Sequence, residues 1–473
     1  MSKNIGKVKE AFKQCDDVIF YEHTYGKKEK AMYIYCPSLC DVEYLNQVIL
    51  PHMQRIYQLT HFDQCSHIEE ACSIKLESVK ELSIREINKH IFHGEIVLWM
   101  DHLNAGYSFS THKFPERQTE ETNIEVSVRG PRDGLIENIE TNIGLIRKRL
   151  PVETLALQTY SIGTKTNTKV CLLYETEKIS PSVVTDIQNK LQGITEQIDE
   201  LVSATQLEEL ISDNPYSVFP LTIYSGRPDF IVSCLLKGRF AILIDGVPGA
   251  LVAPATLSLQ LKTAEDNHFN FLSTSFGRIL RMFSLGISIL LPSFYVSLTG
   301  FHLDQIPFRL LATIALSRMG IPFSIPLEVF LMLFLMEVFR EAGYRLPSSI
   351  GQSITVVGGL IIGDAAIRAG LVSPTLVVTV AASVVAGSTL ISQALTGTVS
   401  VLRFIAVILA SLLGMFGFVL SFMIVVTYLS TLTSFGVPYL APLSPLNLKD
   451  VFRSILLYPR KLKGFKPQYL KKK

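Results

Sequence analysis

The chain has 473 residues, a formal net charge of +2 and 18% charged side chains. This length exceeds what a single hydrophobic core usually serves, so at least two domains are expected. The small net charge gives no sign of a nucleic-acid partner. The charges are unevenly placed, however, because residues 282–430 carry only eleven of them and no lysine. This segregation predicts a polar half followed by a membrane-embedded half.

The N-terminal residues are rich in lysine but are followed by no apolar stretch, so no secretory signal is expected. The seven cysteines, an odd number, indicate a reducing compartment rather than a disulfide framework. Some of them could form a zinc site with nearby histidines: Cys36, Cys40, Cys65, Cys72, His61 and His67. The C-x2-C pair typical of such sites is missing. Buried thiols are therefore preferred, and no metal or cofactor is predicted.

Hydrophobic patterns predict two similar α/β subdomains in the first half. In the first, strands over residues 18–25 and 31–36 precede a helix over 42–57, and a helix over 79–93 precedes strands over 94–101 and 107–111. In the second, strands over 155–161 and 169–174 precede a helix over 182–191, and a helix over 229–236 precedes strands over 238–245 and 250–254. This shared order predicts an internal duplication. Asp101 and Asp245, which end equivalent strands, are interpreted as turn residues rather than catalytic ones.

The segment S-V-R-G-P-R-D-G joins the two subdomains at residues 127–134. Asp133 is predicted to cap a helix over residues 134–150, whose apolar positions form one stripe. Arg129 and Arg132 would then flank the helix N-terminus, where an anion could bind. The alternative, which is preferred, is that both arginines pair with neighbouring acidic side chains.

Four stretches of the second half are apolar and long enough to span a membrane: residues 282–301, 321–339, 373–395 and 404–430. A further apolar stretch, residues 353–372, is either a re-entrant segment or a fifth span. The basic tail and the pair Arg278 and Arg281 place both flanks in the cytoplasm, which requires an even number of crossings. Four crossings are predicted, with Arg403 on the opposite side. The expected domains are residues 1–120, 121–260, 261–448 and a basic tail over 449–473.

Ionisable side chains at membrane depth are costly and are candidates for an ion pathway: Glu328, Glu337, Asp364 and Arg368. Glu328 has no partner within its own helix and is expected to face a cavity or another subunit. Glu337 is expected to join a charge cap at its helix end with Arg340. Asp364 and Arg368, four residues apart, could simply neutralise each other. A hydroxyl-rich stretch over residues 373–389 suits either a pore lining or ordinary helix packing.

The usual nucleotide-binding and hydrolase motifs are absent from the sequence, and an enzyme is not predicted. Several strings instead resemble the A-subunit family of bacterial spore germination receptors. They are S-V-R-G-P-R-D-G-L-I-E-N-I-E-T-N-I-G-L-I-R-K-R-L (127–150), G-R-P-D (226–229), A-I-L-I-D-G-V-P (241–248), R-E-A-G-Y-R-L-P (340–347), I-G-Q-S-I-T-V-V-G-G-L-I-I-G-D-A-A (350–366) and A-G-L-V-S-P (369–374). The family more often has glutamine at the position of Asp364, which weakens any essential role for that charge.

This resemblance implies a subunit of the nutrient germinant receptor, a multi-pass protein of the spore inner membrane with both termini in the cytoplasm. It implies two partners, a permease-like B subunit that binds the nutrient and a lipid-anchored C subunit. It further implies a homo-oligomer, surrounded by membrane lipid, that conducts monovalent cations when the nutrient binds. Two alternatives stay open: a non-conducting scaffold that relays the signal, and an accessory protein of dipicolinic acid release.

Overall fold

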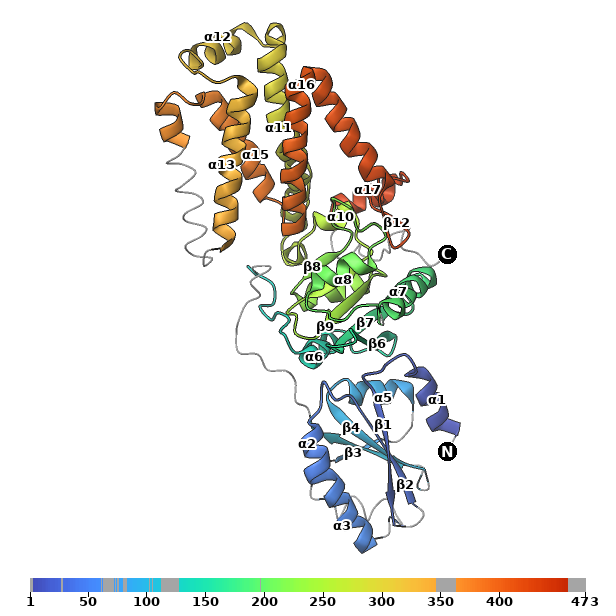
Figure 1. Ribbon diagram of the computed structural model, residues 1–473. Coiled ribbons are helices and arrows are strands. Elements are labelled where there is room, and N and C mark those ends of the chain that lie inside the picture. The colour runs from blue at the N-terminus through green and yellow to red at the C-terminus, as the bar shows by residue number, and fades with distance from the viewer. Residues whose placement is uncertain are drawn as a thin grey trace. The chain divides into compact units, whose positions relative to one another are not determined.

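The computed structural model describes residues 3–26, 29–60, 62, 72, 74, 76–79, 83–101, 103, 105–111, 127–195, 197–345 and 363–457. Within these residues the chain forms two compact units. Unit 1 holds the residues up to Pro215 together with Thr222–Pro254, and unit 2 holds Tyr216–Leu221 and the residues from Ala255 onward. Figure 1 shows sheets in unit 1 and long helices in unit 2. The predicted order, sheets first and helices after, is confirmed.

The first sheet of unit 1 is antiparallel and has the strand order β1-β2-β4-β5-β3. Its strands are β1 (Ile19–Tyr25), β2 (Glu29–Tyr35), β3 (Leu76–Val79), β4 (Glu95–Met100) and β5 (Ala105–Ser110). The helices around it are α1 (Lys3–Ala11), α2 (Val42–Tyr44) with a π-helical turn (Leu45–Ile49), α3 (Leu50–Thr60) and α5 (Ile84–Ile91). The predicted helix over residues 42–57 is thus three consecutive pieces.

Both faces of this sheet are buried, which explains its nearly continuous apolar strands. Tyr33 and Leu98 pack on one side with α3. Ile34 and Val97, their neighbours along the chain, pack on the other side with α1 and α5. Successive side chains of a strand point to opposite faces, so β2 from Ala31 onward and β4 from Ile96 onward are apolar at every position.

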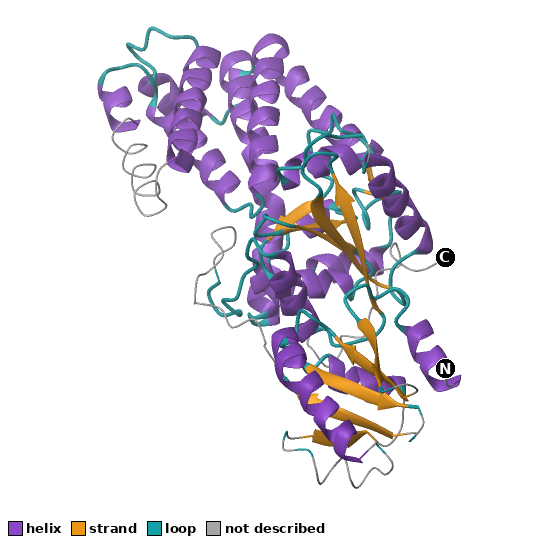
Figure 2. Ribbon diagram, turned by 60° about the horizontal axis from the view of Figure 1, so that its bottom comes forward, coloured by secondary structure: helices purple, strands orange, loops and turns teal. Residues whose placement is uncertain are grey.

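The second sheet of unit 1 repeats the strand order of the first, as β6-β7-β9-β10-β8. Figure 2 shows the strands in orange and the helices in purple. Its strands are β6 (Leu155–Ile162), β7 (Thr168–Glu175), β8 (Ile223–Ser225), β9 (Phe240–Ile244) and β10 (Ala250–Ala253), and its helices are α6 (Ile139–Arg149), α7 (Pro181–Ile194), α8 (Ala204–Ile211) and α9 (Pro228–Leu235). The strands that suggested duplication, β4 and β9, take the same central place in the two sheets. The predicted similarity of the subdomains is therefore visible in their topology.

Unit 2 is a bundle of helices with a two-stranded ribbon near its end. The helices are α10 (Leu257–Gln260), α11 (Phe271–Phe301), α12 (Phe308–Ser317), α13 (Ile325–Arg345), α15 (Pro374–Ser388), α16 (Gln393–Thr431) and α17 (Leu448–Ile455), with 3-10 turns at Ala264–Asn267 and Leu303–Gln305; the ribbon is β11 (Thr433–Ser434) and β12 (Val437–Pro438). Among the described residues, α11 and α16 are long and apolar enough to cross a membrane. The predicted spans over residues 321–339 and 373–395 have other bounds in the structure: α13 begins at Ile325, and α15 ends at Ser388.

Helix α16 is a hairpin rather than one span. Gly414 interrupts it with a φ of 61° and a ψ of −135°. Thr398 and Tyr428 lie on opposite sides of this break, yet both hydrogen-bond to the backbone of Val218, at 2.5 and 3.0 Å. A straight helix would separate two residues thirty positions apart by about 45 Å. Residues 393–413 and 415–431 are therefore two antiparallel arms (Figure 1), and the predicted single span over 404–430 is wrong.

Helices α13 and α15 run in the same direction. Glu328, in the first turn of α13, accepts a hydrogen bond from the backbone N–H of Ser373, the residue that caps α15. Further along, Arg340 of α13 donates to Ser400, and Ser383 of α15 donates to the carbonyl of Ser288. The predicted four-crossing arrangement requires these two segments to run in opposite directions, so that part of the prediction is wrong.

Candidate functional site

The interior of unit 2 is lined with small hydroxyl side chains, while its outer surface is apolar. On α11 the buried positions include Ser284, Ser288, Ser293 and Ser297. The outward positions of the same helix are large and exposed: Leu272, Phe276, Leu280, Phe283 and Ile287. This is the reverse of a soluble helix, whose apolar stripe faces the core. It is typical of helices that pack against one another within lipid.

Pro292 creates an unpaired carbonyl within α11 that two side chains satisfy. Proline has no N–H, so the carbonyl of Ser288, four residues earlier, lacks its helical donor. Arg403 donates to this carbonyl through Nε at 2.7 Å, and Ser383 donates through its hydroxyl at 3.0 Å. Gly387 leaves room for the arginine, because a Cβ there would lie 3.2 Å from an Nη of Arg403. Three helices, α11, α15 and α16, thus meet around one backbone oxygen.

Arg403 is consequently a buried cation, with only 4% of its surface exposed. The sequence predicted it on the outer side of the membrane, but it lies in the first arm of α16, inside the bundle. One turn away, Ser400 accepts a hydrogen bond from Arg340 at 2.6 Å, and Arg340 also pairs with Glu337. The predicted partnership of Glu337 with Arg340 is confirmed.

Glu328 has a charged partner, contrary to the expectation that it faces a cavity or another subunit. Its carboxylate is buried, with 1% exposed, and one oxygen lies 2.8 Å from Nη2 of Arg318. The other oxygen accepts the N–H of Ser373 at 3.2 Å. Arg318 follows α12 directly and reaches Glu328 because the chain turns back between the two helices. Glu328 also lies in the first turn of α13, not within a span, where the helix dipole favours a negative charge.

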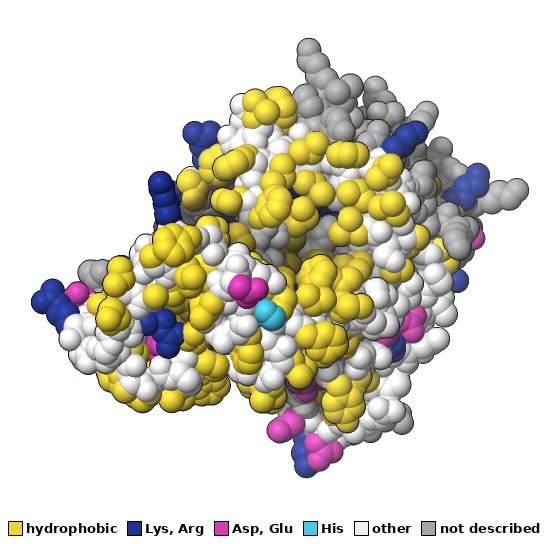
Figure 3. Space-filling view, turned by 90° about the horizontal axis from the view of Figure 1, so that it is seen from above, with side chains coloured by type: hydrophobic (Ala, Val, Ile, Leu, Met, Phe, Trp, Pro, Cys, Tyr) yellow, Lys and Arg dark blue, Asp and Glu magenta, His cyan; other side chains and the backbone are white. Residues whose placement is uncertain are grey.

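The end of unit 2 that holds this ion pair is hollow. A cavity of about 460 Å³ lies between the end of α11, α12 and the start of α13. Its lining includes Thr299, Phe301, Ile314, Arg318 and Ser324. Figure 3 shows hydrophobic side chains gathered around a hollow on this face. Arg318 therefore stands between the cavity and the buried Glu328.

Asp364 and Arg368 form the predicted pair, at 2.8 Å, but they lie on the surface. Their side chains are 58% and 79% exposed. The hydroxyl-rich stretch does not form one continuous row either. Ser383 is buried against α11, whereas Ser388 is exposed and bonds within its own helix. These residues divide between packing and surface positions.

The interdomain motif differs from the prediction in its helix cap and in the place of its two arginines. Helix α6 begins at Ile139, and its N-cap is Asn138, whose side chain accepts the N–H of Thr141. Asp133 instead receives two bonds from Arg149, at 2.6 and 2.5 Å, which removes it from any capping role. Arg129 and Arg132 are exposed. They lie well before the helix N-terminus that they were predicted to flank.

Sequence reasoning missed a buried ion pair that joins the two subdomains of unit 1. Arg147 of α6 is fully buried and binds both oxygens of Asp17, at 2.6 and 2.7 Å. Beside this pair, the backbone N–H of Asp16 donates to the carbonyl of Leu157 at 3.0 Å. Burial disfavours the charge of Arg147, but the attraction of Asp17 outweighs it and raises the pKa of Arg147. The sequence did contain a signal for this ion pair. Arg147 is a charged residue on the otherwise apolar stripe of α6, one helical turn after Ile143.

The cysteine interpretation is confirmed in part. Five cysteines are buried thiols: Cys15, Cys36, Cys40, Cys171 and Cys234. Of the other zinc candidates, Cys65, His61 and His67 lie outside the described residues. Within the part of the chain that the structure describes, no group of three or more metal-ligating side chains comes together.

Comparison with known proteins gives a consistent result. The family described as "Bacillus/Clostridium GerA spore germination protein" matches residues 6–469. The chain is 43% identical to spore germination protein XA of Bacillus anthracis, over 89% of this chain and 85% of that protein. It is 34% identical to spore germination protein B1 of Bacillus subtilis (strain 168), over 97% and 95%. A crystal structure of the N-terminal domain of the A subunit of the Bacillus megaterium receptor GerK3 is also similar, at 22% identity and a TM-score of 0.42 over 54% of this chain and 95% of that one.

Proposed function

Because the chain belongs to the GerA family of spore germination proteins, we propose that it is the A subunit of a nutrient germinant receptor and a cation-conducting component of it. The observation that carries this proposal is the inverted pattern of unit 2. Hydroxyl and charged side chains lie inside, around Ser288 and Arg403, and large apolar ones lie outside. A bundle of this kind is stable in a bilayer and offers polar surface where several copies meet.

The proposal places unit 2 in the spore inner membrane, with both chain ends in the cytoplasm. This placement is supported by contacts between the segment that enters the bundle and the segment that leaves it, since these contacts put both segments at the same end of the bundle. Leu457, after α17, donates its N–H to the hydroxyl of Ser275 near the start of α11, at 2.9 Å. Arg278 donates to the carbonyl of Ser454 at 3.5 Å. A helical bundle whose entry and exit share one end crosses the membrane an even number of times.

The proposed partners are a permease-like B subunit, which binds the nutrient, and a lipoprotein C subunit. The A subunit itself is proposed to form a homo-oligomer, since one bundle of these helices is too small to enclose a wide pore. The support for these partners is the family resemblance of residues 127–374.

A second candidate is a non-conducting scaffold that relays the nutrient signal. The pairing of the buried charges favours it. Glu328 is neutralised by Arg318, and Arg403 is held by a backbone carbonyl. Charges satisfied in this way can serve packing alone.

Ion flux separates the two candidates. The complete receptor, reconstituted in liposomes, should release a monovalent cation when nutrient is added. Arg403→Gln keeps a donor for the carbonyl of Ser288 but removes a positive charge that repels cations, so flux should rise several-fold. Arg309→Gln, which removes an exposed charge of α12, is the matched control and should change nothing. Absence of flux in a fully assembled receptor would favour the scaffold.

A further inference from the structure

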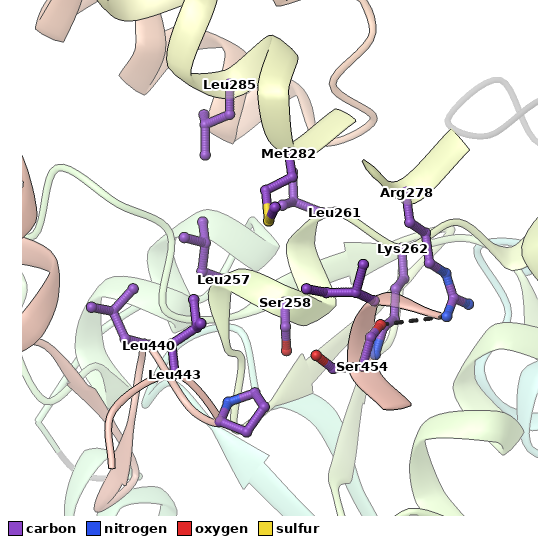
Figure 4. Close-up of a pocket in the computed structure, with 12 residues that line it drawn as sticks. Leu257, Ser258, Leu261, Lys262, Arg278, Met282, Leu285, Leu440, Leu443 and Ser454 are labelled. Carbon is purple, nitrogen blue, oxygen red and sulfur yellow. Dashed lines mark hydrogen bonds between the residues drawn. The ribbon is translucent and has the colours of Figure 1, made fainter. Parts of the chain in front are cut away.

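A narrow pocket, called the slot below, lies in unit 2 beside the N-terminal half of α11. Its walls come from α10, α11, α17 and the loop after β12, and half of the lining side chains are leucine or methionine, including Leu257, Leu285 and Leu440 (Figure 4). The cavity measures about 80 Å³. One water needs about 10–15 Å³ by this kind of measure and at least two polar partners. An apolar slot of this size therefore suits a hydrocarbon group better than water.

One end of the slot is cationic. Figure 4 shows Arg278 and Lys262 together on one side, beside Ser454, and the apolar side chains on the other. Behind them, Asp266 is shared by Arg278 and Arg281, at 2.7 and 2.8 Å. Two guanidinium groups thus share one buried carboxylate, and Lys262 lines the slot beside them.

Two helices that contribute to the slot, α11 and α17, also present exposed apolar side chains on their other faces. Leu280 and Phe283, on the outer face of α11, are 48% and 63% exposed. On the other side, Leu448 and Phe452 of α17 lie one helical turn apart and are 61% and 55% exposed. A short helix with exposed apolar residues next to a spanning helix has the character of an interfacial helix, which lies in the plane of the headgroups.

We propose that this slot binds an anionic phospholipid of the surrounding bilayer. One acyl chain would enter the apolar slot, and the phosphate would lie at the cationic end formed by Arg278 and Lys262. Helix α17 would lie in the headgroup layer, with Leu448 and Phe452 turned into the hydrocarbon. The occupant is a lipid rather than a peptide because the slot combines an apolar wall with a basic end, on a helix whose opposite, exposed face only bilayer can cover in the proposed arrangement. This inference rests on the membrane insertion of unit 2 proposed above.

The full-length protein in detergent should be examined by native mass spectrometry after addition of phosphatidylglycerol or phosphatidylcholine. Retention of phosphatidylglycerol should exceed that of phosphatidylcholine. Lys262→Gln should reduce the preference about fivefold, as expected for one basic side chain near an anionic headgroup. Leu257→Trp fills the slot and should reduce retention of both lipids. Lys165→Gln, an exposed lysine of unit 1 that does not line the slot, is the control and should behave like the unchanged protein.

Two outcomes would overturn the inference, and flotation of the same protein with lipid vesicles distinguishes them. If the protein floats but retains both lipids equally, or if Lys262→Gln and Leu257→Trp bind as the unchanged chain does, the slot is not an anionic-lipid site. If the protein fails to float, the proposed membrane insertion fails as well. A circular dichroism spectrum of each variant ensures that lost binding is not lost folding.

Discussion

Among single residues, the fully buried Arg147 is one whose loss should weaken unit 1 strongly. It is buried with Asp17 between the two subdomains, so Arg147→Met would leave a buried carboxylate without its counter-charge. Such a change costs about 3–5 kcal/mol of unfolding free energy. Trp99 is the only tryptophan and is buried in the first subdomain. Its fluorescence during denaturant unfolding of the full chain therefore reports the effect.

Two variants test this explanation of the Arg147 effect. Adding Asp17→Asn to Arg147→Met should recover part of the lost stability, because the stranded charge is removed. Lys165→Met breaks an ion pair whose two side chains are 75% and 63% exposed. It should leave the unfolding midpoint nearly unchanged. If Lys165→Met lowered the unfolding free energy as much as Arg147→Met does, the effect of Arg147→Met could not be attributed to the burial of its ion pair.

The buried cysteines should be unreactive and should make stability depend on alkaline pH. Burial raises the pKa of Cys40 to about 12 and that of Cys171 to about 11. In the unfolded chain these thiols ionise near pH 8.5. The folded state thus holds protons that the unfolded state has lost, and stability should fall as pH rises from about 8.5 to 11. Peptide mapping after iodoacetamide treatment at pH 8 should show the half-buried Cys72 modified before the buried cysteines, and modification of Cys171 before unfolding would contradict this.

Because Glu328 is paired with Arg318, its substitution should have a different effect from that of an unpaired carboxylate. Glu328→Gln leaves Arg318 without its buried counter-charge, so subunit abundance in spore membranes should fall. Adding Arg318→Gln should restore abundance, since an amide pair can replace the ion pair. Cation release at restored abundance then shows whether the charges themselves serve conduction. Normal abundance of Glu328→Gln alone would mean that the pair contributes nothing to folding.

Among the elements, the hairpin of α16 depends on Gly414. A positive φ is strained for any residue with a Cβ, and a Cβ there would lie 3.0 Å from Cγ of Phe301. Gly414→Ala should therefore destabilise unit 2 by about 1–3 kcal/mol. Gly286→Ala, in the interior of α11 with open space around it, is the matched control and should be neutral or stabilising. Thermal unfolding in detergent measures both, and equal behaviour would contradict the hairpin.

The same elements show what the sequence could predict. Strands β4 and β9 were located within two residues because a buried strand between glycine and aspartate is a local signal. The turn at Gly414 was missed because the apolar sequence continues without interruption through it. Hydropathy depends on the side chains and carries no information on backbone angles. The cap of α6 was misplaced because Asp133 and Asn138 are both good caps. The contact with Arg149, sixteen residues later, decided between them.

The partners of buried charges were the least predictable feature of the site. Arg318 precedes Glu328 by ten residues, across a turn whose geometry no periodicity describes. Arg403 reaches the carbonyl that Pro292 leaves free, more than a hundred residues away. The proline was visible in the sequence, but the donor that would satisfy the carbonyl of Ser288 was set by tertiary packing.

At the scale of the whole molecule, the shared entry and exit of the helical bundle predict that both flanks of unit 2 face the cytoplasm. Cysteines introduced at Ser182, exposed in α7, and at Lys449, exposed in α17, should react with a membrane-impermeant maleimide from that side only. A cysteine at Asp304, exposed just after α11, should react from the opposite side. Right-side-out and inverted vesicles provide the two directions, and labelling of the native cysteines in the unchanged chain gives the background. Labelling of the Ser182 and Lys449 positions from opposite sides would require an odd number of crossings, which the contact between Leu457 and Ser275 does not allow.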